Sequence, residues 1–179
     1  MMKHTLKAAA LAGLALLLTG CQTAKQRALC PAVSILATTS NLTKFKDGLQ
    51  GDPSGVQFNI EMIAVKASCD VDVDEGTTDS DIDITFRATR APSGEQANFT
   101  APFYVAPLLD GKTILDKKMI ATSFTFQPGE TTITFKENVP STLIKFANGI
   151  KPYQYSIVVG LQLTPEQLTY SKNHGRFGP

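Results

Sequence analysis

The chain has 179 residues, of which 42% are hydrophobic and 18% are charged, a balance typical of a folded protein and too apolar for an intrinsically disordered one. The formal net charge is only +1, so composition gives no electrostatic basis for binding nucleic acid. This length accommodates one domain that buries a core, together with a linker.

Residues 1–20 have the pattern of a secretory signal peptide. Lys3 and Lys7 form a basic start, and the apolar run of residues 8–18 is followed by two small residues. The run is shorter than the roughly twenty residues that a membrane-spanning helix needs. We therefore expect a signal peptide; the alternatives are an ordinary secretory signal before a coincidental cysteine, or a buried helix.

The last residues of this segment, Leu18, Thr19, Gly20 and Cys21, resemble the lipobox of bacterial lipoproteins. The resemblance implies a diacylglyceryl thioether on Cys21, cleavage before it and acylation of the new amine. Gln22, in place of Asp, implies export to the outer membrane. We expect a lipid-anchored protein that faces the periplasm, held firmly because two or three acyl chains anchor far better than one.

Residues 21–29 show no apolar periodicity, which predicts a short tether between the anchor and the domain. Its Lys25 and Arg27 either rest on anionic headgroups or remain solvated. The folded domain is expected over residues 30–170.

With Cys21 assigned to the anchor by the lipobox resemblance, Cys30 and Cys69 remain as a pair. The periplasm is oxidising, so a disulfide between them is expected, with two buried free thiols as the alternative. A metal site is disfavoured, since no Cys-x-x-Cys is present and the only histidine after Cys21 is His174. The disulfide would fasten the first element of the domain to a central strand.

Apolar residues at every second position predict strands through most of the domain. A change of parity near Ile63 and Ala64 predicts a β-bulge. Pro31 and Pro107 favour edge positions for their strands, because proline cannot donate to a ladder. The expected strands cover residues 32–38, 56–69, a hairpin over 70–86, 103–109, 114–126, 131–135 and 153–163.

Other segments lack this alternation. Residues 43–54 contain glycine and proline and predict a loop, whereas residues 139–148 suggest a helical turn or an irregular crossover. Thr164, followed by proline and then glutamine, predicts the start of a short helix that ends near Tyr170. Residues 171–179 are expected to form a flexible tail.

About seven strands with almost no helix predict an all-β fold, an antiparallel β-sandwich with a short C-terminal helix, preceded by the signal peptide. Residues 153–160 resemble a late strand of immunoglobulin-like or fibronectin-like domains, where a tyrosine anchors a corner. The resemblance implies an immunoglobulin-like sandwich; a small barrel is the alternative.

Seven of the sixteen acidic residues lie between residues 70 and 83. Carboxylate oxygens are ligands for Ca²⁺, the one cofactor suggested by the sequence. No glutamate stands at the twelfth loop position, so the segment departs from an EF-hand, and a solvated face that discourages edge aggregation explains the same residues. The candidate ligands are Asp70, Asp72, Asp74, Asp79 and Asp81.

No motif for nucleophilic, metal-dependent or phosphate-binding catalysis is present, so we expect no catalytic residues and no enzyme activity. The less favoured alternative is an enzyme whose cleft gathers acids or hydroxyls from distant strands. Four phenylalanines suggest either a ligand groove or, as we favour, sandwich core: Phe99, Phe103, Phe124 and Phe126.

The chain as a whole is similar to small lipoproteins of Gram-negative, especially alphaproteobacterial, envelopes, in its lipobox, Cys30-Pro31, Cys69 and residues 160–170. The resemblance implies no particular activity. We expect a non-enzymatic module that binds another envelope protein.

Overall fold

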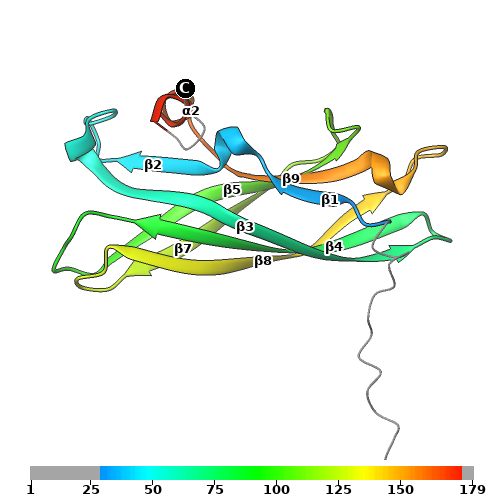
Figure 1. Ribbon diagram of the computed structural model, residues 1–179, viewed down its shortest axis with the longest axis horizontal. Coiled ribbons are helices and arrows are strands. Elements are labelled where there is room, and N and C mark those ends of the chain that lie inside the picture. The colour runs from blue at the N-terminus through cyan, green and yellow to red at the C-terminus, as the bar shows by residue number, and fades with distance from the viewer. Residues whose placement is uncertain (1–28, 175–179) are drawn as a thin grey trace, which may run out of the picture.

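The computed structural model describes residues 29–174, which fold into two β-sheets packed face to face (Figure 1). The lipobox and residues 21–28 lie outside the described residues. The first sheet contains β1 (Ala32–Ile35), β5 (Ala97–Leu109), β6 (Thr113–Ile114), β7 (Lys118–Phe126) and β9 (Tyr155–Leu161). The second contains β2 (Asn41–Phe45), β3 (Val56–Asp72), β4 (Thr77–Thr89) and β8 (Thr132–Lys145).

Four short helical segments complete the described chain: η1 (Ala37–Thr39), η2 (Pro53–Gly55), η3 (Pro152–Gln154) and α2 (Pro165–His174). None of the helices within residues 29–174 has the length and apolar character needed to cross a bilayer.

The expected all-β sandwich is confirmed, with one departure from purely antiparallel pairing. The second sheet has the order β2-β3-β4-β8, all antiparallel. In the first sheet, β1 pairs in parallel with β9, which in turn pairs with β5. The predicted edge position of β1 is correct, whereas an immunoglobulin-type topology stays a prediction.

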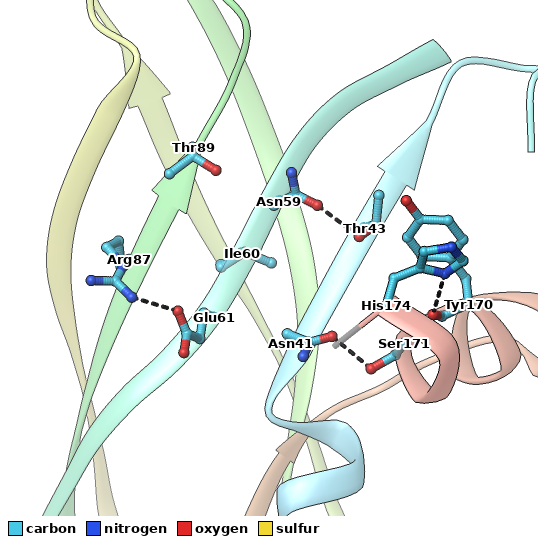
Figure 2. Close-up of a pocket in the computed structure, with 10 residues that line it drawn as sticks. All are labelled: Asn41, Thr43, Asn59, Ile60, Glu61, Arg87, Thr89, Tyr170, Ser171 and His174. Atoms are coloured by element: carbon cyan, nitrogen blue, oxygen red, sulfur yellow. Dashed lines mark hydrogen bonds and ion pairs between the residues drawn. The ribbon is translucent and has the colours of Figure 1, made fainter. Parts of the chain in front are cut away.

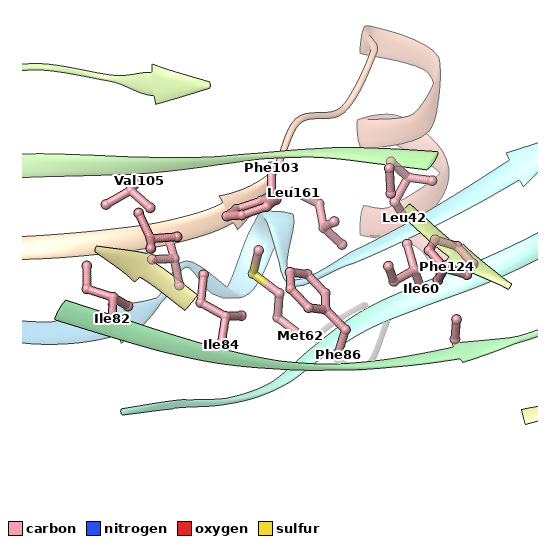
Figure 3. Close-up of a cluster of buried hydrophobic side chains, with 14 of the residues drawn as sticks. Leu42, Ile60, Met62, Ile82, Ile84, Phe86, Phe103, Val105, Phe124 and Leu161 are labelled. Atoms are coloured by element: carbon pink, nitrogen blue, oxygen red, sulfur yellow. The ribbon is translucent and has the colours of Figure 1, made fainter. Parts of the chain in front are cut away.

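The core lies between the two sheets and is rich in aromatic rings (Figure 3). Phe86 and Phe103 meet edge to face across the sheets, with ring centroids 5.5 Å apart. Phe103, Phe124 and Phe126 are buried, and Phe99 packs against them, so the prediction that these rings form core is confirmed. Burying such side chains contributes roughly 2 kcal/mol each in transfer free energy.

The predicted bulge and hairpin of the second sheet are also confirmed. The register between β3 and β4 shifts between Met62 and Ala64. Beyond the bulge the two strands continue together to a tight turn at residues 73–76. Asp72 caps this turn by accepting hydrogen bonds from the backbone N–H groups of Asp74 and Glu75. The long twisted hairpin of β3 and β4 therefore runs along most of the molecule and turns at one of its ends (Figure 1).

Two segments not predicted as strands are strands. Asn41–Phe45, largely inside the expected loop, forms β2, where Leu42 and Phe45 are buried. The two buried residues are three positions apart because the register shifts between Lys44 and Phe45, so the sequence of this strand does not alternate. Residues 139–145 continue β8. A register shift opposite Ser80 and Ile82 and a positive φ of 56° at Ser141 interrupt this strand and break the alternation of the sequence.

Pro107 was expected at an edge, and this prediction is wrong. β5 is a central strand that begins at Ala97, earlier than expected, and Pro107 is paired with Ile157 of β9. On its other side, β7 ends its pairing at Val105 and β6 begins at Leu108. The carbonyl of Pro107 accepts from Leu115 on this side, and the missing N–H falls in the gap between the two partner strands.

The helix α2 begins as predicted and ends later. Thr164 and Gln167 form the expected reciprocal cap, with distances of 2.9 and 3.2 Å. The helix continues to His174, so residues 171–174 of the expected tail are helical. The reason is tertiary: Ser171 is buried and donates a hydrogen bond of 2.6 Å to Asn41 on β2.

Candidate functional site

The predicted disulfide between Cys30 and Cys69 is present. Their Cα atoms are 5.9 Å apart, and 39 positions separate them in the sequence. The bond joins the start of the described domain to β3, next to the acidic hairpin. The expected lipidation site, Cys21, lies outside the described residues.

The structure places the five candidate Ca²⁺ ligands along the hairpin without bringing them to one point. Asp70 lies directly opposite Asp79, whereas Asp81 lies opposite Ser68. Asp72 is used to cap the turn, and Asp74 is at its exposed tip. Within residues 29–174, no group of three or more acidic, histidine or cysteine side chains is arranged to hold a metal ion.

One oxygen of this acidic segment is nevertheless unusual. Asp79 Oδ2 accepts a hydrogen bond of 3.0 Å from the hydroxyl of Ser141, while its Oδ1 is buried without a hydrogen-bond partner. A hollow of about 550 Å³ follows the hairpin end and is lined by Asp70, Asp72, Asp74 and Asp79 among others. An unpaired buried carboxylate oxygen is costly, so this position is a candidate for a bound cation.

The outer face of the first sheet is apolar near β6. Leu108 lies opposite Ile114, and Tyr104 lies opposite Met119, so these side chains share the face that points away from the core. Ile114 is 61% exposed and Met119 is 49% exposed, with Leu115 beside them. We call this surface the outer patch; its exposed residues are Ile114, Leu115 and Met119, whereas Tyr104, Ala106 and Leu108 on the same face are buried.

The outer face of the second sheet is polar, and α2 stands beside it to form a groove of about 420 Å³ (Figure 2). Six side chains from three strands form two rows across its floor. The register places Asn41, Glu61 and Arg87 in one row and Thr43, Asn59 and Thr89 in the other. We call this surface the polar groove.

Hydrogen bonds fix the side chains of the groove. Arg87 Nη2 lies 2.7 Å from Glu61 Oε2, and the hydroxyl of Thr43 donates to Asn59 Oδ1 at 2.6 Å. On α2, the rings of Tyr170 and His174 stack with centroids 4.3 Å apart. Phe45 meets Tyr170 edge to face at 5.0 Å and so supports this wall.

Sequence reasoning identified the disulfide and the acidic hairpin but missed both the outer patch and the polar groove. Each draws its residues from several strands, so only the register brings them together. Comparisons of this chain with protein-family models, with curated proteins and with solved structures find no match.

Proposed function

We propose that this protein is a lipid-anchored lipoprotein of the outer membrane whose sandwich faces the periplasm and binds another envelope protein without catalysing a reaction. The anchor rests on the lipobox resemblance of residues 18–21. The disulfide at Cys30 supports a domain that begins only nine residues after Cys21, close to the membrane.

The outer patch carries the proposal of a protein partner. Outer faces of antiparallel sandwich sheets are normally solvated and polar, as the second sheet is here. On the first sheet, the large apolar side chains of Ile114, Leu115 and Met119 are instead exposed. Exposed apolar patches of this kind mark interaction sites on stable domains.

Features around the patch indicate the chemistry of the partner. Lys117 is exposed beside it, with its ammonium 4.4 Å from the centre of the Tyr104 ring, which favours an acidic side chain at this point of the partner's contact. Within the described part of the chain, β7 pairs only with β5, so its other edge offers backbone groups for an added strand.

Site-specific photo-crosslinking in intact cells tests this proposal. A photoreactive residue at Met119 should capture one reproducible envelope protein, and Ile114→Asp should abolish that product. In the matched control the photoreactive residue replaces Thr134, an exposed residue opposite Arg87 on the outer face of the second sheet. Equal products from both positions, or none from Met119, would contradict the proposal.

A second candidate function is Ca²⁺-dependent binding at the acidic hairpin, favoured by the unpartnered Oδ1 of Asp79 beside the hollow. Ca²⁺ prefers six to eight oxygen ligands, and Asp70 on the opposite strand is the nearest further carboxylate in the register. Calorimetry with Ca²⁺ should then show heat that Asp79→Asn removes. Absence of both heat and a Ca²⁺-dependent rise in melting temperature eliminates this candidate.

A further inference from the structure

We propose that the polar groove binds an uncharged segment of a glycan chain. This inference concerns the opposite face of the sandwich from the outer patch and does not depend on the protein partner proposed above.

The first argument is the order of the groove floor. The six side chains of the two rows stand on neighbouring strands, so their spacing is set by the sheet and not by a flexible loop. The Glu61–Arg87 ion pair and the Thr43–Asn59 hydrogen bond hold four of them in place before any ligand arrives. Such pre-ordering reduces the entropy lost on binding.

The second argument is which hydrogen-bonding groups remain for a ligand. Asn59 Oδ1 is taken by Thr43, and Asn41 Oδ1 accepts from Ser171, so the –NH₂ groups of both amides remain available as donors. The hydroxyls of Thr89 and Tyr170 make no hydrogen bond within the described residues and can both donate and accept. A ligand with closely spaced hydroxyl groups matches this mixed set.

The third argument is charge. Glu61 stands in the middle of its row, between Asn41 and Arg87, and repels a phosphate or carboxylate approaching the guanidinium. The same ion pair gives no net charge that would attract a cation. The floor therefore favours an uncharged polar ligand over an ionic one.

The fourth argument is the wall on α2. His174 is exposed and stacks on Tyr170 with an angle of 16° between the rings, which leaves a flat surface at the side of the polar floor (Figure 2). A sugar ring matches both parts of the groove. Its C–H face packs on an aromatic ring, and the hydroxyl groups at its rim bond to the polar floor. An extended peptide would instead seek backbone groups, which the face of a sheet does not offer.

The test uses the full protein, purified from membranes in detergent and titrated with three neutral oligosaccharides: chitohexaose, cellohexaose and maltohexaose. At least one should bind, and Asn59→Ala should weaken its affinity by about fivefold or more, because one hydrogen bond is lost. Arg87→Lys should also weaken it, since the planar fork of donors is lost while the charge is kept.

Asn98→Ala is the matched control. Asn98 is likewise exposed on a strand, and its Oδ1 accepts a hydrogen bond of 2.7 Å from a threonine, Thr125, but it lies on the first sheet. This variant should bind the oligosaccharide as the parent does, and circular dichroism should show that all variants fold. The proposal is overturned if no oligosaccharide binds, if Asn59→Ala and Asn98→Ala have equal effects, or if only a neutral Ser/Thr peptide binds.

Discussion

Tyr104 lies against Gly160 on the outer face of the first sheet, as its direct cross-strand neighbour in β9. Its hydroxyl is 2.9 Å from Thr39 Oγ1, and the Lys117 ammonium lies 4.4 Å from the centre of its ring. The ring can occupy this place because glycine has no side chain. The pair thus joins η1, β5, β9 and the segment before β7 at one point.

Gly160→Ala should therefore destabilise the fold. A Cβ at this position would lie 2.5 Å from the hydroxyl oxygen of Tyr104 and 2.7 Å from its Cζ. Displacing a packed ring costs about 1–3 kcal/mol in the free energy of unfolding. Urea denaturation measures this loss, and Gly94→Ala, where no atom lies within 4 Å, is the control. Equal midpoints for the two variants would show that the ring moves at no cost.

Removing the disulfide should cost more than this. The bond closes a loop of 39 residues, for which the chain-entropy model gives a stabilisation of about 4 kcal/mol. Thermal unfolding of the oxidised protein with and without a reductant measures the difference. A variant with both Cys30→Ser and Cys69→Ser should match the reduced protein and no longer respond to the reductant. If the reductant still lowers the melting temperature of this variant, the loss of stability does not come from the disulfide.

Cys21→Ser should release the protein from the membrane without unfolding it. The sulfur is the expected site of the lipid, whereas the described domain begins after it. Labelling with palmitate should be lost, and the protein should appear in the soluble fraction with its disulfide intact. Cys30→Ser serves as the control, since it removes a cysteine and keeps the lipobox. Continued palmitate labelling of Cys21→Ser would refute the assigned anchor.

Asp52 provides a prediction about pH. The backbone N–H and then the hydroxyl of Ser54 donate to its Oδ1, and these bonds hold the pKa of Asp52 below its ordinary value. Because the pKa of Asp52 is lower in the folded state, these hydrogen bonds stabilise the fold at pH values above the unfolded pKa. This stabilisation is lost as the pH falls through the folded pKa. Titration followed by NMR should show that Ser54→Ala raises the pKa of Asp52. An unchanged midpoint would mean that the hydroxyl bond does not persist in solution.

The sequence predicts the strands that have one buried face and a regular partner. β3, β4 and β9 alternate clearly, because inward residues such as Ile60, Ile84 and Ile157 are fully buried. β2 was missed because a register shift at Lys44 and Phe45 breaks its alternation. The end of β8 was missed because the irregularity at Ser141 changes which residues face inward. Such positions depend on tertiary pairing, which no local pattern records.

The candidate sites also differ in whether a local sequence pattern predicts them. The disulfide was expected because the lipobox resemblance assigns Cys21 to the anchor and leaves two cysteines, and the acidic hairpin follows from a local cluster. The polar groove requires the two registers that join three strands and the extra turn of α2, which exists because Ser171 reaches Asn41, 130 positions earlier in the sequence. A pattern of Asn, Thr, Glu and Arg spread over such distances resembles ordinary solvated strand residues.

The sulfur bridge also determines how the domain bears mechanical load. A force applied to the chain that precedes Cys30 is transmitted through the disulfide to Cys69 in β3. This strand is paired with β4 along most of its length. The four-residue edge strand β1 does not carry this force, although it is the first strand after the pulled end. Without the bridge, the same pull would peel β1 from β9 one residue pair at a time. The oxidised domain is therefore built to resist a pull on the chain that precedes Cys30.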